Sequence, residues 1–81
     1  MRSLNVTEVA QKIDGSVPFI PNYTVVAINA TAASATIQSS NAQAGTYATI
    51  AVVPAGEARE IVLNNDWIKL LAAGKLVLLG N

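Results

Sequence analysis

The sequence predicts an all-β fold, a small antiparallel sandwich or barrel of about six to seven short strands. From residue 23 onward, short runs rich in valine, isoleucine, threonine and aromatic residues recur roughly every ten residues. Glycine, proline and asparagine separate these runs and favour turns. The runs do not show the apolar spacing of a helix, so we expect no long helix in this region.

Six strands are expected in this region, with the ranges 23–30, 35–39, 46–53, 58–63, 67–71 and 75–79. In the third run, Ala48, Ile50 and Val52 alternate with their neighbours and are expected to form its inner face. The last two runs are apolar on both faces, as expected for strands that sheet, loop or a neighbouring subunit covers on both sides. We therefore expect a subunit interface along these runs.

The turn residues predict how the strands connect. Val53–Gly56 places proline second and glycine fourth, which matches a type I turn and a hairpin. Leu71–Lys75 has the form of a three-residue hairpin loop in which Gly74 takes the left-handed region. Together with the turn residues at 64–66, this loop makes the last three expected strands a meander.

The N-terminal residues differ from the rest of the chain. We expect one domain, made of an N-terminal arm or edge segment (1–22) and a β-sandwich or barrel core (23–81). Residues 4–13 fit a short helix and an extended strand equally well.

The end of this arm is the candidate partner-binding segment. Pro18 and Pro21 hold it extended. Phe19, between the two prolines, is expected either in its own core or as an anchor in a neighbour's pocket. The candidate partner-binding residues are Val17, Phe19, Ile20 and Tyr23.

The composition indicates a domain with a largely neutral surface. Of the 81 residues, 52% are hydrophobic, and five basic and five acidic residues give a net charge of zero. A domain of this size without a disulfide or a metal often needs packing between subunits, so we expect a homo-oligomer. The basic residues are scattered and form no stripe that would neutralise phosphates, which argues against nucleic acid. The charge-free residues 15–56 are broken by prolines and polar residues, so they do not form a membrane-spanning helix.

The residue types that carry most enzyme chemistry are rare in this chain. It has no cysteine and no histidine, so thiolate nucleophiles, imidazole bases and the usual zinc sites are excluded. Glu57 and Glu60 are three apart in an expected strand and should point to opposite faces. The triplet Asn64–Asp66 is expected to form a turn rather than a calcium site. We therefore expect no enzyme, no catalytic residues, no cofactor and no metal.

Three Asn-x-Thr triplets begin at Asn5, Asn22 and Asn29. Such triplets accept glycans only in a secreted protein, and the sequence after Met1 lacks the apolar core and cleavage site of a signal peptide. We interpret them as products of an asparagine- and threonine-rich composition. The chain is expected to stay where it is made until it assembles.

Three segments of the chain carry a resemblance to a known group of proteins. They are Val17–Ala30 running into Ala35–Gln38, the turn Val53–Gly56, and the C-terminal stretch that begins Trp67–Leu71 and continues through Leu76–Asn81. Together they resemble small all-β virion proteins of tailed bacteriophages, in particular capsid decoration or cement proteins.

This resemblance implies a non-enzymatic protein that is made in the host cytoplasm and sits on the outer capsid surface of the virion. It implies an oligomer, often a trimer, that binds the major capsid protein or another virion protein and bridges capsomers. One alternative is a tail, neck or fibre adaptor of the virion. Another is a small carbohydrate-binding module in which Trp67 or Tyr47 stacks on a sugar.

Overall fold

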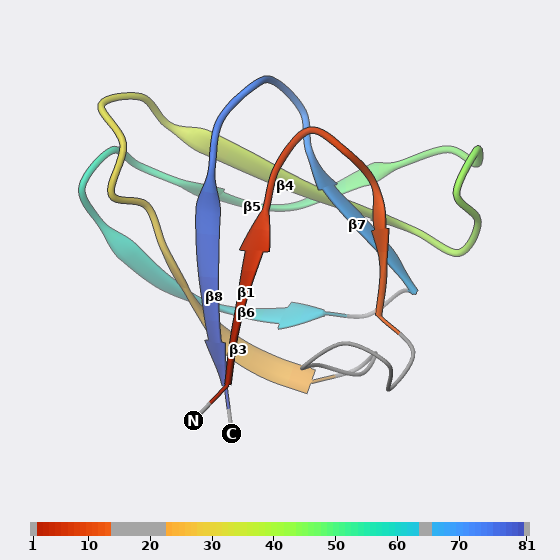
Figure 1. Cartoon of the computed structure of the whole chain (residues 1–81), viewed down its shortest axis with the longest axis horizontal. Coiled ribbons are helices and arrows are strands. Elements are labelled where there is room, and N and C mark those ends of the chain that lie inside the picture. Colours follow the sequence, from red (N-terminus) through yellow and green to blue (C-terminus); the bar gives the residue numbers. More distant parts are fainter. Residues whose placement is uncertain (1, 14–22, 64–65, 81) are drawn as a thin grey trace.

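The computed structural model describes residues 2–13, 23–63 and 66–80, which form two antiparallel four-stranded sheets packed face to face (Figure 1). Sheet A has the strand order β1 (Arg2–Val6), β8 (Leu76–Gly80), β3 (Tyr23–Ile28) and β6 (Ala58–Leu63). Sheet B has the order β2 (Gln11–Lys12), β7 (Trp67–Leu70), β4 (Ala35–Ser40) and β5 (Ala48–Val53). The predicted all-β sandwich is confirmed, and each of the six expected strands is present.

The first residues of the chain are part of both sheets. β1 pairs with β8 along its whole length, and β2 pairs with β7. Of the two alternatives for residues 4–13, the structure therefore shows the extended one. Val6 and Ile13 are fully buried in the core. The boundary expected between an arm (1–22) and a core (23–81) thus separates strands that lie in the same sheets.

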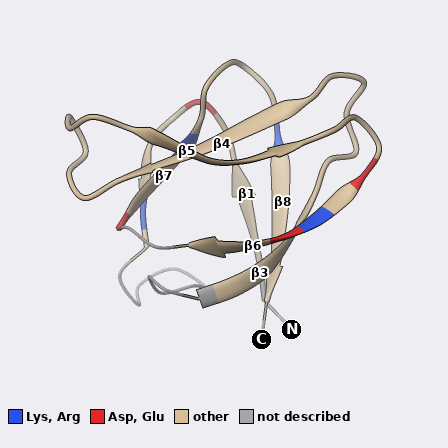
Figure 2. Cartoon of the chain, turned by 180° about the vertical axis from the view of Figure 1, so that it is seen from behind, with Lys and Arg blue, Asp and Glu red and all other residues tan. Residues whose placement is uncertain are grey.

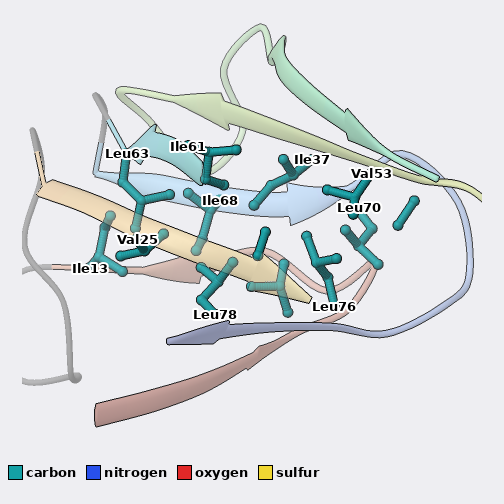
Figure 3. Close-up of a cluster of buried hydrophobic side chains, with 13 residues drawn as sticks. Ile13, Val25, Ile37, Val53, Ile61, Leu63, Ile68, Leu70, Leu76 and Leu78 are labelled. Carbon is teal, nitrogen blue, oxygen red and sulfur yellow. The ribbon is translucent and has the colours of Figure 1, made fainter. Parts of the chain in front are cut away.

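A single apolar layer fills the space between the sheets, and side chains from both sheets point into it (Figure 3). Its members are aliphatic throughout, because alternate positions on each strand face the other sheet. They are Val6, Ile13, Val25, Ala27, Ala35, Ile37, Val53, Ile61, Leu63, Ile68, Leu70, Leu76 and Leu78.

The predicted inner face of β5 is wrong over half of the strand. Val53 is fully buried, whereas Val52 is 52% exposed. The pairing of β4 with β5 shifts between Ile37 and Gln38, so β5 carries one extra residue in a bulge. Because the bulge changes the two-residue period, adjacent residues Ile50 and Ala51 both pack against the core.

The predicted meander is also wrong. After β6 in sheet A the chain crosses to β7 in sheet B and returns to β8 in sheet A. Among the described strands, β4 and β5 are the only neighbours in sequence that pair with each other. The segment 71–75 therefore joins two sheets instead of closing a hairpin, and Gly74 does not adopt the positive φ expected of it.

The turn after β5 begins one residue later than predicted and also crosses between the sheets. The Glu57 N–H donates to the Pro54 carbonyl at 3.1 Å, which makes Pro54 the first turn residue. Gly56 has a φ of 73°, the left-handed region that the third position of a type II turn requires. The predicted type I hairpin at Val53–Gly56 is thus replaced by a type II turn that leads into the other sheet.

A buried asparagine connects this turn region with the loop between β3 and β4. The Asn29 side chain is 1% exposed, and its amide donates to the carbonyls of Ala33 at 2.8 Å and Val53 at 2.9 Å. Its oxygen accepts hydrogen bonds from the N–H of Thr31 at 2.9 Å and from its hydroxyl at 2.6 Å. The Asn29 N–H donates to the Glu57 carbonyl. Both hydrogens of the side-chain amide are in use and buried, so this Asn-x-Thr triplet has a structural role.

Replacing Asn29 with alanine should destabilise the fold by about 2 to 4 kcal/mol, because it leaves buried carbonyl groups without donors. Urea unfolding measures the effect. Thr31→Ala is the matched control: it keeps the amide's two donated bonds, so its cost should be only about 1 kcal/mol. Equal costs for the two variants would show that the Asn29 amide is not the centre of this cluster.

Gly56→Ala should destabilise by about 1 to 2 kcal/mol. An added Cβ would meet no atom within 4 Å, so the cost comes from the positive φ and not from a clash. Gly56→Asn should cost less, since asparagine tolerates the left-handed region better than alanine. Thermal unfolding of the two variants compares them, and a larger loss for asparagine would contradict this explanation.

Candidate interaction surface

The outer face of sheet A is largely apolar along its central strands, β8 and β3, whereas its edge strands also place Ser3, Asn5 and Glu60 there. Its side chains alternate with those of the core, and the ladder places Val26 opposite Leu79 and Ile28 opposite Val77. Val62, on the neighbouring strand β6, is opposite Thr24. We define the sheet A face by its five large aliphatic residues, Val26, Ile28, Val62, Val77 and Leu79.

Water reaches this face. Val26 is 40% and Val62 is 51% exposed, and the other three members are partly exposed. An antiparallel sheet with one solvated face normally carries polar residues on that face. The sheet A face instead carries neighbouring exposed and partly exposed aliphatic side chains, which makes it the candidate interaction surface of the molecule.

Charge is almost excluded from the sheet A face. β3 and β8 contain no charged residue, and the charged positions of sheet A lie on its edge strands, as Arg59 and Glu60 do on β6 (Figure 2). On β6, Glu60 is the charged residue that shares the outer face, where it is opposite Val26. Arg59 points to the other side of the strand and forms an ion pair with Glu57 at 2.6 Å.

The outer face of sheet B is more polar. Gln38 is opposite both Lys69 and Thr49 and donates from its amide to the Thr49 hydroxyl at 3.5 Å. The Lys69 ammonium lies 4.7 Å from the centre of the Tyr47 ring, a cation–π contact. The two sides of the sandwich therefore differ, with sheet A apolar and sheet B hydrated.

The aromatic residues named for sugar stacking lie on this polar side. Trp67 is partly exposed and lies opposite Ser40 on the outer face of sheet B, whereas its neighbour Ile68 is fully buried. The Tyr47 hydroxyl donates to the Gln43 carbonyl at 2.8 Å. Lys69 already occupies one face of the Tyr47 ring.

A groove of about 590 Å³ runs between the two strands that end the sheets on one side. It is lined by residues 49–52 of β5 and residues 59–62 of β6. Since β5 is the last strand of sheet B and β6 the last strand of sheet A, backbone groups of both strands border this groove.

The described residues bring together few groups that could do chemistry. In residues 2–13, 23–63 and 66–80, no three aspartate, glutamate, histidine or cysteine side chains gather to hold a metal ion. None of these residues belongs to a helix that could span a membrane. Glu57 is held by Arg59, while Glu60 lies on the sheet A face.

The predicted partner-binding residues are largely outside the described part of the chain. Val17, Phe19 and Ile20 are not described, and Tyr23 is placed only as the first residue of β3, where it pairs with Leu63. Their role in binding stays a prediction. The interface expected along the last two runs also stays a prediction: β8 supplies Val77 and Leu79 to the sheet A face, whereas β7 is not apolar on both sides, because Trp67 and Lys69 face outward.

The contributions of β3 and β6 to the sheet A face could not be identified without the strand order. Val26 and Val62 belong to alternating strands that look ordinary in the sequence. Only the pairing of β3 with both β6 and β8 puts these side chains beside one another.

Comparison with protein-family models, with curated proteins and with solved structures finds no match to this chain.

Proposed function

We propose that this chain is a structural virion protein of the capsid decoration or cement type, which binds the outer capsid surface of a tailed bacteriophage. The observation that supports a structural role is the sheet A face, five exposed or partly exposed aliphatic residues with one charged neighbour. The resemblance of the sequence to small phage virion proteins supports the choice of partner, the major capsid protein or another virion protein.

The size of the sheet A face argues for binding through many copies. Its residues lie on three strands, which are about 4.8 Å apart and five residues long and cover roughly 240 Å², using a rise of about 3.3 Å per residue. A stable interface between two proteins needs about 800 Å² on each side. One copy therefore binds weakly, and an oligomer that contacts several capsid subunits at once gains strength from multivalency.

Assembly with other copies of the chain is part of this proposal. The resemblance implies an oligomer, often a trimer, and a mass measurement gives the number of copies. The alternative role as a tail, neck or fibre adaptor uses the same apolar face. Counting copies per particle separates the two, since a decoration protein is present on every capsomer and an adaptor only at one vertex.

Val26→Lys should greatly reduce binding to capsids that lack the protein, because it places a charge in the centre of the sheet A face. The measurement is co-sedimentation of purified protein with such capsids. Val52→Lys is the matched control: Val52 is 52% exposed on the outer face of sheet B, so this variant should bind like the original chain. Equal binding by all three proteins would exclude the sheet A face as the contact surface.

The same binding should depend only weakly on salt. Ionic strength screens interactions between charges, and the sheet A face contributes one carboxylate. Co-sedimentation at low and high sodium chloride should therefore give similar saturation curves. A steep loss of binding with salt would show that charged residues outside this face make the contact.

A further inference from the structure

The open edge of β6 has backbone groups that can pair with another strand. The Asn29 N–H donates to the Glu57 carbonyl at 2.9 Å, which fixes the phase of the β3–β6 ladder. In an antiparallel ladder, residues alternate between pairs that exchange hydrogen bonds and pairs that do not. Since Glu57 is hydrogen-bonded to Asn29, which directly follows β3, every second residue after Glu57 also points its N–H and C=O groups toward β3. The residues between them, Ala58, Glu60 and Val62, point these groups away from β3.

The other sheet edges are modified in ways that limit pairing. On β1, the outward carbonyl of Asn5 accepts a hydrogen bond from the Gln11 side chain at 2.7 Å. β2 is only two residues long, and the bulge interrupts β5. Short strands, bulges and local caps are common ways of protecting an edge. β6 is six residues long and its register shows no shift.

Part of the β6 edge is already occupied. The Arg59 guanidinium donates to the outward carbonyl of Ala58 at 2.8 Å and to the Glu57 carboxylate at 2.6 Å. Within the described part of the chain, nothing pairs with the outward N–H and C=O groups of Glu60 and Val62. These two residues leave two donors and two acceptors available.

A second copy of this chain fits these groups in one register. A twofold pairing that exchanges at least four hydrogen bonds between residues of two β6 strands centres on residue 59, 60 or 61. Centring on 59 places two Arg59 residues opposite each other, and centring on 60 does the same with Glu60; like charges directly opposite are unfavourable. Both arrangements also need the Ala58 carbonyl that Arg59 occupies.

Centring on Ile61 avoids these conflicts. Glu60 of each copy then lies opposite Val62 of the other, and the four hydrogen bonds between them use only the available groups. Arg59 keeps its bonds to Ala58 and Glu57. Neither Glu60 nor Arg59 has a like charge directly opposite.

We propose that two copies of this chain associate through their β6 edges, with Ile61 of each copy opposite Ile61 of the other. Sheet A then continues across the contact as one eight-stranded sheet, twice the four strands of a single copy. Residues opposite each other in a ladder share a face, so the two sheet A faces join on one side of the pair. This association does not depend on the capsid role, although it doubles the apolar surface that the role uses.

Sedimentation equilibrium tests this proposal by measuring the mass of the purified chain in solution. The purified chain should have a mass of about 17 kDa, twice its 8.4 kDa. Val62→Pro removes an N–H that no bond among residues 2–13, 23–63 and 66–80 uses, and proline is tolerated at such edge positions, so this variant should be a folded monomer. Val62→Thr keeps the N–H and the branched shape and should remain a dimer.

A chain that sediments as one or three copies would overturn the proposal, as would a dimer that survives Val62→Pro. A trimer would agree with the expected capsid role while contradicting this twofold contact, which separates the two proposals. Circular dichroism shows whether each variant keeps its strand content.

Cysteine cross-linking tests the register without relying on the proline variant. The chain has no cysteine, so a single introduced thiol can form a disulfide only between copies. Ile61→Cys places two thiols in a close non-hydrogen-bonded pair, and copper phenanthroline with dissolved oxygen should oxidise them to a cross-linked dimer. Arg59→Cys lies opposite Leu63 of the other copy and should cross-link at least tenfold more slowly. Faster cross-linking of Arg59→Cys would overturn the register.

Discussion

The structure depends on burying one layer of aliphatic side chains between two sheets. The chain crosses repeatedly from one sheet to the other as it supplies their strands. β1, β3, β6 and β8 belong to sheet A, and β2, β4, β5 and β7 belong to sheet B. Neither sheet can be built from one continuous segment, so both must come together for the core to form. Folding is therefore dominated by pairing between residues far apart in sequence, which favours slow and cooperative folding. Asn29 supports this arrangement by bonding to Ala33 and Val53 across the end of the sandwich.

The same alternation that forms the core also produces the candidate surface. On β3, Val25 and Ala27 face the core while Val26 and Ile28 face outward. Since both sets are apolar, sheet A has the composition of a sheet covered on both faces. Sheet B instead places Gln38 and other polar residues outside. The two sides of the molecule thus differ, and the proposed role on a shell uses the more apolar one.

Local features of the sequence were sufficient to predict six of the eight strands, whereas they left residues 4–13, which include β2 and part of β1, open between a helix and a strand. The two-residue period and the turn residues located all six expected strands, because both are properties of neighbouring residues. The connections were wrong because a turn such as Pro54–Glu57 does not specify which sheet the next strand joins. The face of β5 was wrong because the bulge at Ile50 is set by pairing with β4.

The sheet A face was harder to predict than the strands, because it too depends on which strands pair with each other. The contribution of β8 to the sheet A face could be predicted because the strand is apolar on both faces, which is visible in the sequence alone. The participation of Val26 and Val62 depends on strand order, and the open edge of β6 depends on the phase of its ladder with β3. The role of Asn29 was missed because its Asn-x-Thr triplet was attributed to composition, whereas Thr31 in that triplet completes the buried cluster.

The most direct test of this account is a cryo-EM reconstruction of the protein bound to capsids that lack it, at a resolution that orients the two sheets. The account predicts that sheet A lies against the shell, with Val26 and Leu79 in the contact and the polar face of sheet B toward solvent. Bound protein with sheet B against the shell, or the sheet A face open to water, would contradict it.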